Sequence, residues 1–190
     1  HFAFCFPDTY EVGMSHLGMK ILYAAMNQQP DMLCERAFMP WVDMMDLMKQ
    51  ENVPLFTLES HSPLSAFDVV GFTLQYEMSY SNILAMLELG GIPLLRENRR
   101  EEDPIVVAGG PCAFNPEPLA DFIDAFMVGD GEEQILELCE HYNAWKQRGG
   151  TREEFLLEMA NIEGNYIPRF YEPEYDENGE FKALNRLRDM

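Results

Sequence analysis

The fold is decided by residues 104–138, which read PIVVAGGPCAFNPEPLADFIDAFMVGDGEEQILEL. This stretch holds two short apolar runs, Pro104–Ala108 and Asp124–Val128, and each run ends in a glycine turn. A helical pattern from Glu132 to about Trp145 follows the second turn. Because strands that alternate with helices pair in parallel through right-handed crossovers, the stretch predicts one side of a parallel sheet covered by helices.

The same alternation extends back to the N-terminus. Phe2–Phe6 and Met32–Met39 have the length of strands, and residues 68–74 (DVVGFTL) form a continuous apolar run typical of a strand buried on both faces. Helical patterns separate these runs, and in the first of them Met14, Leu17, Ile21, Leu22 and Ala25 share one face. The sequence therefore predicts an α/β fold with a doubly wound, mainly parallel five-stranded sheet, of the flavodoxin-like kind. Val53–Leu58 is a candidate for one extra edge strand.

The pattern changes after Gly149-Gly150. Thr151 and Glu154 have the spacing of a capping box and predict a helix to about Asn161. Asn178-Gly179, flanked by extended segments, is a strong hairpin signal and predicts a β-hairpin over residues 164–185. We therefore expect a Rossmann-type domain over residues 1–148 and an appendage of helix and hairpin over residues 149–190.

Composition limits the classes of partner. The chain has 13 Lys and Arg against 33 Asp and Glu, a net charge of -20, which would repel a nucleic-acid backbone. It has no run of about 18 apolar residues for a membrane span, and no basic N-terminal segment of the signal type. We expect a cytoplasmic protein that binds neither nucleic acid nor membranes.

Cysteines and histidines show no metal-binding spacing. The four cysteines contain no C-x-x-C pair and the four histidines no H-E-x-x-H pattern. Three of the cysteines lie in apolar runs, where a thiol packs as a small hydrophobic group. We expect reduced structural cysteines, no metal ligands and no catalytic residues in this chain.

The candidate binding site lies beyond the carboxyl ends of the predicted strands. In open parallel sheets, ligands bind at that edge, near the point where the strand order reverses. The residues there are Asp8–Gly13, Thr73–Tyr76, Gly109–Asn115 and Gly129–Glu133. Glycine allows the backbone to approach a bulky ligand closely. The alternative is that these glycines serve only the turn and the acidic residues only the helix N-termini.

Three motifs together point to a known family. Residues 6–24 (FPDTYEVGMSHLGMKILYA), residues 68–75 (DVVGFTLQ) and residues 105–138 resemble the cobalamin-binding-like domain that precedes the barrel in many radical SAM proteins. The resemblance covers about residues 2–145. It implies a cobalamin-binding-like three-layer sandwich, followed in the full-length protein by a radical SAM barrel that this chain does not contain. Both ends of the chain read as if cut from a longer polypeptide.

The first loop departs from the family's cobalamin binders. Those of the methionine-synthase type carry D-x-H-x-x-G, whose histidine binds cobalt, whereas this loop has Asp8, Tyr10 and Gly13 at the matching positions. A neutral phenol with a pKa of about 10 is a poor cobalt ligand. The resemblance implies cobalamin as a candidate ligand held without a protein ligand below the metal. The candidate cofactor-binding residues are Asp8, Tyr10, Gly13, Thr73, Gln75, Gly109, Gly110 and Gly129.

The chemistry of a radical SAM enzyme is absent from this chain. The C-x-x-x-C-x-x-C motif that holds the [4Fe-4S] cluster does not occur. We therefore expect the cluster and S-adenosylmethionine only in the barrel, and no enzymatic activity in this chain alone, although the full-length protein is expected to be a radical SAM enzyme.

Two functions remain open at this stage. In the first, which Tyr10 favours, the domain is a non-catalytic cap or dock for the barrel of the same polypeptide, with its pocket filled by side chains such as Tyr10 and Tyr76. In the second, the domain binds a corrinoid across the carboxyl ends of the strands. An FMN-binding flavodoxin-like protein is a weaker alternative, because the first loop lacks a phosphate cradle rich in serine and threonine.

Overall fold

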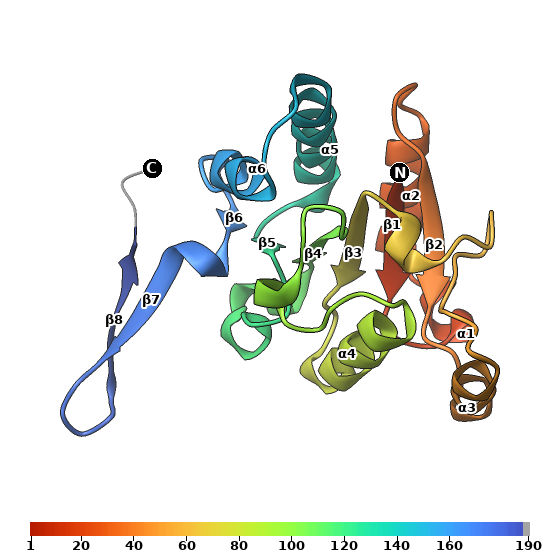
Figure 1. Ribbon diagram of the computed structural model, residues 1–190, viewed down its shortest axis with the longest axis horizontal. Coiled ribbons are helices and arrows are strands. Elements are labelled where there is room, and N and C mark those ends of the chain that lie inside the picture. Colours follow the sequence, from red (N-terminus) through yellow and green to blue (C-terminus); the bar gives the residue numbers. More distant parts are fainter. Residues whose placement is uncertain (188–190) are drawn as a thin grey trace.

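The computed structural model describes residues 1–187 and shows a three-layer α/β arrangement (Figure 1). Its main sheet has six strands in the order β2-β1-β3-β4-β5-β6. All neighbouring pairs are parallel except β5 and β6, which are antiparallel. The predicted doubly wound, mainly parallel sheet is confirmed. The strands are β1 (Phe2–Phe6), β2 (Cys34–Phe38), β3 (Val69–Thr73), β4 (Ile105–Gly109), β5 (Ala125–Met127) and β6 (Asn165–Tyr166).

Helices cover both faces of this sheet. Residues of α2 (Leu17–Asn27), α5 (Gly131–Arg148) and α6 (Arg152–Met159) build one core, and residues of α3 (Val42–Glu51) and α4 (Tyr80–Leu89) build the other. The strand order reverses between β1 and β3, which defines the switch point of the fold. The remaining elements are short: α1 (Tyr10–Gly13) and the 3-10 turns Leu64–Ala66, Glu77–Ser79, Arg96–Asn98, Pro111–Phe114, Glu117–Leu119 and Pro168–Phe170. None of the helices within residues 1–187 is long and apolar enough to cross a membrane.

The central strand β3 shows why the sheet is buried on both sides. All five of its residues are buried, and Val70 and Phe72 pack into the core on the α3–α4 face while Val69 packs on the opposite face. Gly71 has no side chain on that opposite face, where a Cβ would lie 2.4 Å from the Phe2 ring. The ring of Phe2 therefore lies directly over the backbone of β3.

The candidate edge strand over residues 53–58 is wrong. This segment forms only an isolated antiparallel bridge between Phe56 and Pro63 and belongs to no strand of the sheet. The Thr57 hydroxyl donates to the buried carboxylate of Glu35 on β2, and the Thr57 N–H donates to the Ser62 carbonyl. Because Glu35 needs hydroxyl donors, the chain folds back as a loop over β2 instead of adding a strand.

Glu35 gives a pH-dependent prediction. Burial disfavours its ionised form, but donation from the Thr57 and Ser60 side chains and from the Ser60 N–H outweighs burial and holds the pKa of Glu35 below its ordinary value. A carboxylate with a lowered pKa stabilises the folded state above its unfolded pKa of about 4.3, and this contribution is lost as the pH falls through the folded pKa. Glu35→Gln should therefore lower the free energy of unfolding by about 1–3 kcal/mol at pH 7.

Urea unfolding at several pH values checks this expectation. The difference between Glu35→Gln and the parent should shrink below a pH of about 4, where the unfolded-state carboxyl is protonated. Glu177→Gln, an exposed residue of the hairpin turn, is the matched control and should unfold like the parent at every pH. A loss that is the same at low and neutral pH would contradict the role of the Glu35 charge.

The C-terminal segment contains the predicted helix and hairpin. Thr151 and Glu154 form both bonds of the capping box at the start of α6. The hairpin consists of β7 (Tyr171–Tyr175) and β8 (Phe181–Arg186), whereas Asn165 and Tyr166 pair with β5 instead of joining the hairpin. α6 packs into the core beside α5. The boundary after residue 148 stays a prediction, and residues 188–190 of the expected appendage lie outside the described residues.

A buried ionic cluster ties α6 to the amino ends of β4 and β5. Asp124 Oδ2 accepts from Arg99 Nη1 at 2.9 Å and from Arg152 Nη2 at 2.6 Å. The three side chains are at most 6% exposed. The same oxygen accepts the N–H of Val106 on β4 at 2.8 Å. One carboxylate therefore neutralises part of two buried positive charges and fixes the position of α6 on the sheet.

Candidate functional site

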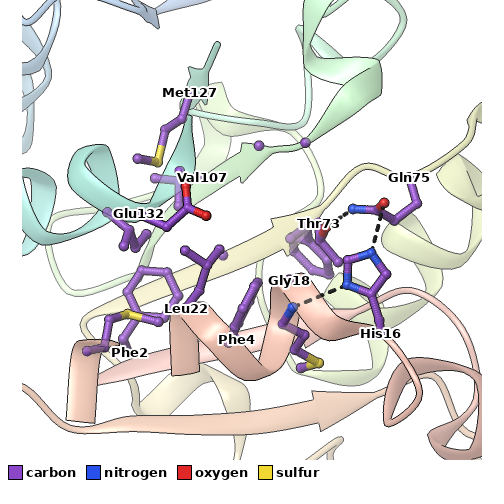
Figure 2. A pocket seen from close by; sticks show the side chains of 18 of the residues that line it. Phe2, Phe4, His16, Gly18, Leu22, Thr73, Gln75, Val107, Met127 and Glu132 are labelled. Carbon is purple, nitrogen blue, oxygen red and sulfur yellow. Dashed lines mark hydrogen bonds between the residues drawn. The ribbon is translucent and has the colours of Figure 1, made fainter. Parts of the chain in front are cut away.

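A cavity of about 170 Å³ lies between the sheet and helices α2 and α5, near the carboxyl ends of the strands (Figure 2). Residues from β1, β3, β4 and β5 form its floor, and residues along α2 and from the first turns of α5 form its other wall. Space exists there because many lining positions have no side chain. The glycines that line it are Gly18, Gly71, Gly109, Gly110, Gly129 and Gly131.

The inner wall of the cavity is apolar. In another protein, an apolar cavity of about 150 Å³ stays dry and binds benzene. A cavity of this size and lining is therefore suited to a flat ring. The apolar lining residues whose side chains pack on this face of the sheet are Phe2, Phe4, Met19, Leu22, Met26, Val107, Met127 and Ile135.

Hydrogen bonds join several polar side chains at the mouth of the cavity, and Figure 2 draws these bonds as dashed lines. His16 caps the N-terminus of α2, because its Nδ1 accepts the N–H of Met19 at 3.2 Å. Its Nε2 lies 3.1 Å from Gln75 Oε1, and Gln75 Nε2 donates to the Thr73 hydroxyl oxygen at 2.5 Å. His16, Gln75 and Thr73 thus connect the N-terminus of α2 to the end of β3.

These contacts fix the direction of each hydrogen bond. Since Nδ1 of His16 accepts, its proton is on Nε2, and this N–H donates to the Gln75 carbonyl oxygen. The Gln75 amide must then turn its NH₂ to Thr73, whose hydroxyl oxygen accepts. The proton of the Thr73 hydroxyl is left to donate to a ligand. The mouth therefore presents a hydrogen-bond donor to whatever enters the cavity.

The charges around the cavity favour a neutral ligand. The helix N-termini of α2 and α5 supply partial positive charge, but no lysine or arginine is among the lining residues. Glu132, in the first turn of α5, is the one acidic residue among the lining residues that the structure describes (Figure 2). The lining therefore suits a neutral group better than a charged one.

Five of the sequence-predicted site residues meet at this cavity. Thr73 ends β3 and Gln75 follows it, Gly109 ends β4, and Gly110 and Gly129 lie in the turns after β4 and β5. Gly110 has a φ of +111°, which a side chain rarely adopts. The five residues are Thr73, Gln75, Gly109, Gly110 and Gly129.

The other three predicted residues, Asp8, Tyr10 and Gly13, do not line the cavity. Asp8 accepts the hydroxyl of Tyr76 at 3.0 Å, a hydrogen bond that raises the pKa of Tyr76. The half-exposed ring of Tyr10 packs edge-on against Phe38, with ring centroids 5.4 Å apart. A Cβ at Gly13 would lie 2.4 Å from Phe38, so this glycine serves close packing. Tyr10 and Tyr76 therefore do not fill the cavity.

Several lining residues were missed in the sequence. Phe2 and Phe4 alternate along β1 and face the cavity, and this alternation was a usable signal. His16 precedes α2 at the carboxyl edge, which is the position of an N-cap. Glu132 lies within the candidate range Gly129–Glu133, but the sequence favoured a role at the helix N-terminus for it. Within residues 1–187, no three His, Cys, Asp or Glu side chains are arranged to hold a metal ion.

Sequence comparison relates the chain to one family of known proteins. The sequence model of the family described as "Radical SAM proteins, N-terminal" matches residues 18–168. An uncharacterized protein of Methanocaldococcus jannaschii is 30% identical over 139 residues, which are 72% of this chain and 26% of that protein. The chain thus spans about a quarter of the length of that relative. No solved structure gives a significant match. With most of its length matched, the chain belongs to the family of N-terminal regions of radical SAM proteins.

Proposed function

We propose that this chain is a non-catalytic module that holds the benzimidazole ring at the nucleotide end of a corrinoid in its cavity and presents the cofactor to a radical SAM domain. The observation that carries the proposal is the apolar, glycine-lined cavity with a directed hydrogen-bond donor at its mouth. When bound, a corrinoid supplies a cobalt centre that carries a methyl group.

The residues of the cavity fit the benzimidazole ring at the end of the corrinoid nucleotide. The apolar walls suit a flat, neutral ring, and the Thr73 hydroxyl offers a donor for a ring nitrogen. The residues of the first loop do not fit axial ligation, because Tyr10 stands where the family's binders have histidine and its ring packs on Phe38. The proposal is therefore a corrinoid without a protein ligand on cobalt.

The radical SAM domain would lie over the carboxyl edge of the sheet. Exposed apolar side chains come from the loops after β1, β2, β3 and β4, at the edge where the cavity opens. Met78 is 85% exposed and Phe114 76% exposed, which is unusual for side chains of this size in one region. A second domain that covers this edge would bury them and shield the cofactor from water. The exposed residues are Tyr10, Val12, Trp41, Val42, Tyr76, Met78 and Phe114.

Comparing two corrinoids tests the proposal. Hydroxocobalamin carries the nucleotide and cobinamide lacks it, so the purified chain should bind hydroxocobalamin about tenfold or more tightly, the equivalent of about 1.4 kcal/mol. The corrin absorbance bands follow the titration, and the bound form should lack imidazole and benzimidazole on cobalt. Equal affinity for the two compounds, or no saturable binding of either, would contradict a nucleotide pocket.

Thr73→Val removes the donor at the mouth and keeps the shape of the side chain. Losing one hydrogen bond of about 0.5–1.5 kcal/mol should weaken hydroxocobalamin binding by roughly two- to twelvefold. Thr9→Val is the matched control, because Thr9 lies at the same edge, outside the cavity lining, and makes no side-chain cap hydrogen bond. Isothermal titration calorimetry measures both variants. A control that weakens binding as much as Thr73→Val would show that the loss is not specific to the donor.

A further inference from the structure

The hairpin formed by β7 and β8 has two chemically different faces. Residues that pair across an antiparallel ladder lie on the same face. Pro173 pairs with Leu184, and Tyr175 pairs with Phe181 after a register shift between Glu174 and Tyr175 that places one extra residue in β8. The rings of Tyr175 and Phe181 meet edge to face, with centroids 6.3 Å apart. Tyr175 is 58% exposed, Phe181 64% and Leu184 39%. We call Pro173, Tyr175, Phe181 and Leu184 the apolar hairpin face.

The opposite face is polar and paired within itself. Glu174 forms an ion pair with Lys182 and accepts a hydrogen bond from Asn185. Glu172 pairs with Asn185 across the ladder and is exposed. This face is suited to remain in water, whereas the apolar hairpin face is not.

The base of the hairpin is held by the core. Ile167 and Phe170, directly before β7, are buried in the core beside α6, and the N–H of Leu187 donates to the Phe170 carbonyl at 2.9 Å. Figure 1 shows the hairpin standing clear of the sheet, with its turn toward the end of the molecule where α1 follows β1. That end is the carboxyl edge of the sheet. The core therefore fixes the direction in which the hairpin projects, and the rest of the described chain leaves the hairpin uncovered along its length.

An uncovered hairpin of this kind needs a partner. A single two-stranded hairpin is at best marginally stable in water unless it packs against other elements. A second copy of this chain is a poor occupant, because each copy carries a net charge of -20. The family match ends at residue 168, just before β7. The aligned region covers only 26% of the matched relative, so most of that protein lies outside it. The occupant that these facts favour is the radical SAM domain of a longer polypeptide.

We propose that the apolar hairpin face docks against the radical SAM domain and orients it over the carboxyl edge, where the cavity opens. This inference rests on the proposed function, since it takes the radical SAM domain as the partner. The docking surface on that domain must be apolar, and Glu172 and Glu174 must stay on the solvent side. The hairpin then acts as a fixed arm between the two domains.

Hydrogen exchange of the full-length polypeptide tests the docking. Amides of residues 171–186 should exchange about tenfold or more slowly in the full-length polypeptide than in this chain alone, because docking adds roughly 1.4 kcal/mol to local stability. Equal exchange in both would overturn the proposal. Slow exchange of this chain alone that depends on its concentration would also overturn it, because a second copy would then be the occupant.

Two double variants separate docking from folding. Tyr175→Ser with Phe181→Ser removes the apolar hairpin face, and Glu172→Ser with Asn185→Ser changes the polar face as the matched control. In the full-length polypeptide, the segment of the radical SAM domain that contacts the module should lose its protection only in the first variant. Loss in both variants, or in neither, contradicts docking through this face.

Corrinoid titrations of the same variants keep the two proposals distinguishable. The cavity lining contains no hairpin residue, so both double variants should bind hydroxocobalamin like the parent. If the parent binds no corrinoid but its hairpin is protected in the full-length polypeptide, the docking stands and the proposed cofactor fails. If corrinoid binds and the hairpin is unprotected, only the docking fails.

Discussion

Asp124→Asn should lower the free energy of unfolding by about 3–5 kcal/mol, the largest effect we expect from a single substitution. The carboxylate of Asp124 is the ionic partner of both Arg99 and Arg152. Both guanidinium groups also donate to backbone carbonyls, so they cannot move into water without breaking those bonds. Asparagine would keep one acceptor oxygen but leave two buried positive charges uncompensated.

Urea unfolding followed by circular dichroism measures this loss. Asp121→Asn is the matched control, because Asp121 is exposed and its side chain lies outside the cluster, and it should change stability by no more than about 0.5 kcal/mol. If Asp124→Asn unfolds within about 1 kcal/mol of the parent, then the two arginines find other compensation and the cluster does not secure α6.

Gly109→Val should abolish most of the corrinoid binding while the fold is kept. A Cβ at Gly109 would lie 3.4 Å from the Met127 carbonyl oxygen, an ordinary contact, and valine suits an extended strand. The added methyl groups would occupy the cavity beside Met127, so the affinity for hydroxocobalamin should fall by about tenfold or more. Gly110 is a poorer choice, because its φ of +111° would strain any side chain there.

Ala183→Val on β8 is the control for this experiment, since it adds bulk to a strand far from the cavity. It should bind hydroxocobalamin like the parent, and both variants should keep the thermal unfolding midpoint within a few degrees, as expected for a change of about 0.5–1 kcal/mol. A Gly109→Val variant that is folded and binds as tightly as the parent would place the ligand elsewhere on the molecule.

Strands β1, β3, β4 and β5 were predictable because each is a short, mostly apolar run buried from both sides. Strand β6 was not predicted as part of this sheet, because Asn165 and Tyr166 are only partly buried and form no apolar run. The faces of the helices were less predictable. Leu17 and Ile21 share a face with Leu22 in the sequence pattern, yet Leu17 is 68% and Ile21 42% exposed, and Met19 and Met26 are buried instead. A helical pattern identifies an apolar face, but it does not tell which partner covers that face.

The site was predictable where it depends on the backbone and not where it depends on distant side chains. Glycines after β4 and β5 marked the turns that line the cavity. To predict the apolar wall of the cavity, one would need to know that Phe2 lies over Gly71 on the neighbouring strand, which is a long-range contact. The contact between His16 and Gln75 likewise joins residues 59 positions apart. The loop with Tyr10 pointed to the correct edge of the sheet, although its ring packs outside the cavity.

Electron paramagnetic resonance of the bound corrinoid in its cobalt(II) state tests the central claim most directly. If the benzimidazole ring lies in the cavity and Tyr10 offers no ligand, no nitrogen is bound to cobalt, and the cobalt hyperfine lines of the complex should be unsplit. A nitrogen ligand would split each of these lines further into three. That splitting, whether from a histidine or from benzimidazole still on the metal, would contradict a nucleotide held in the cavity without a protein ligand on cobalt.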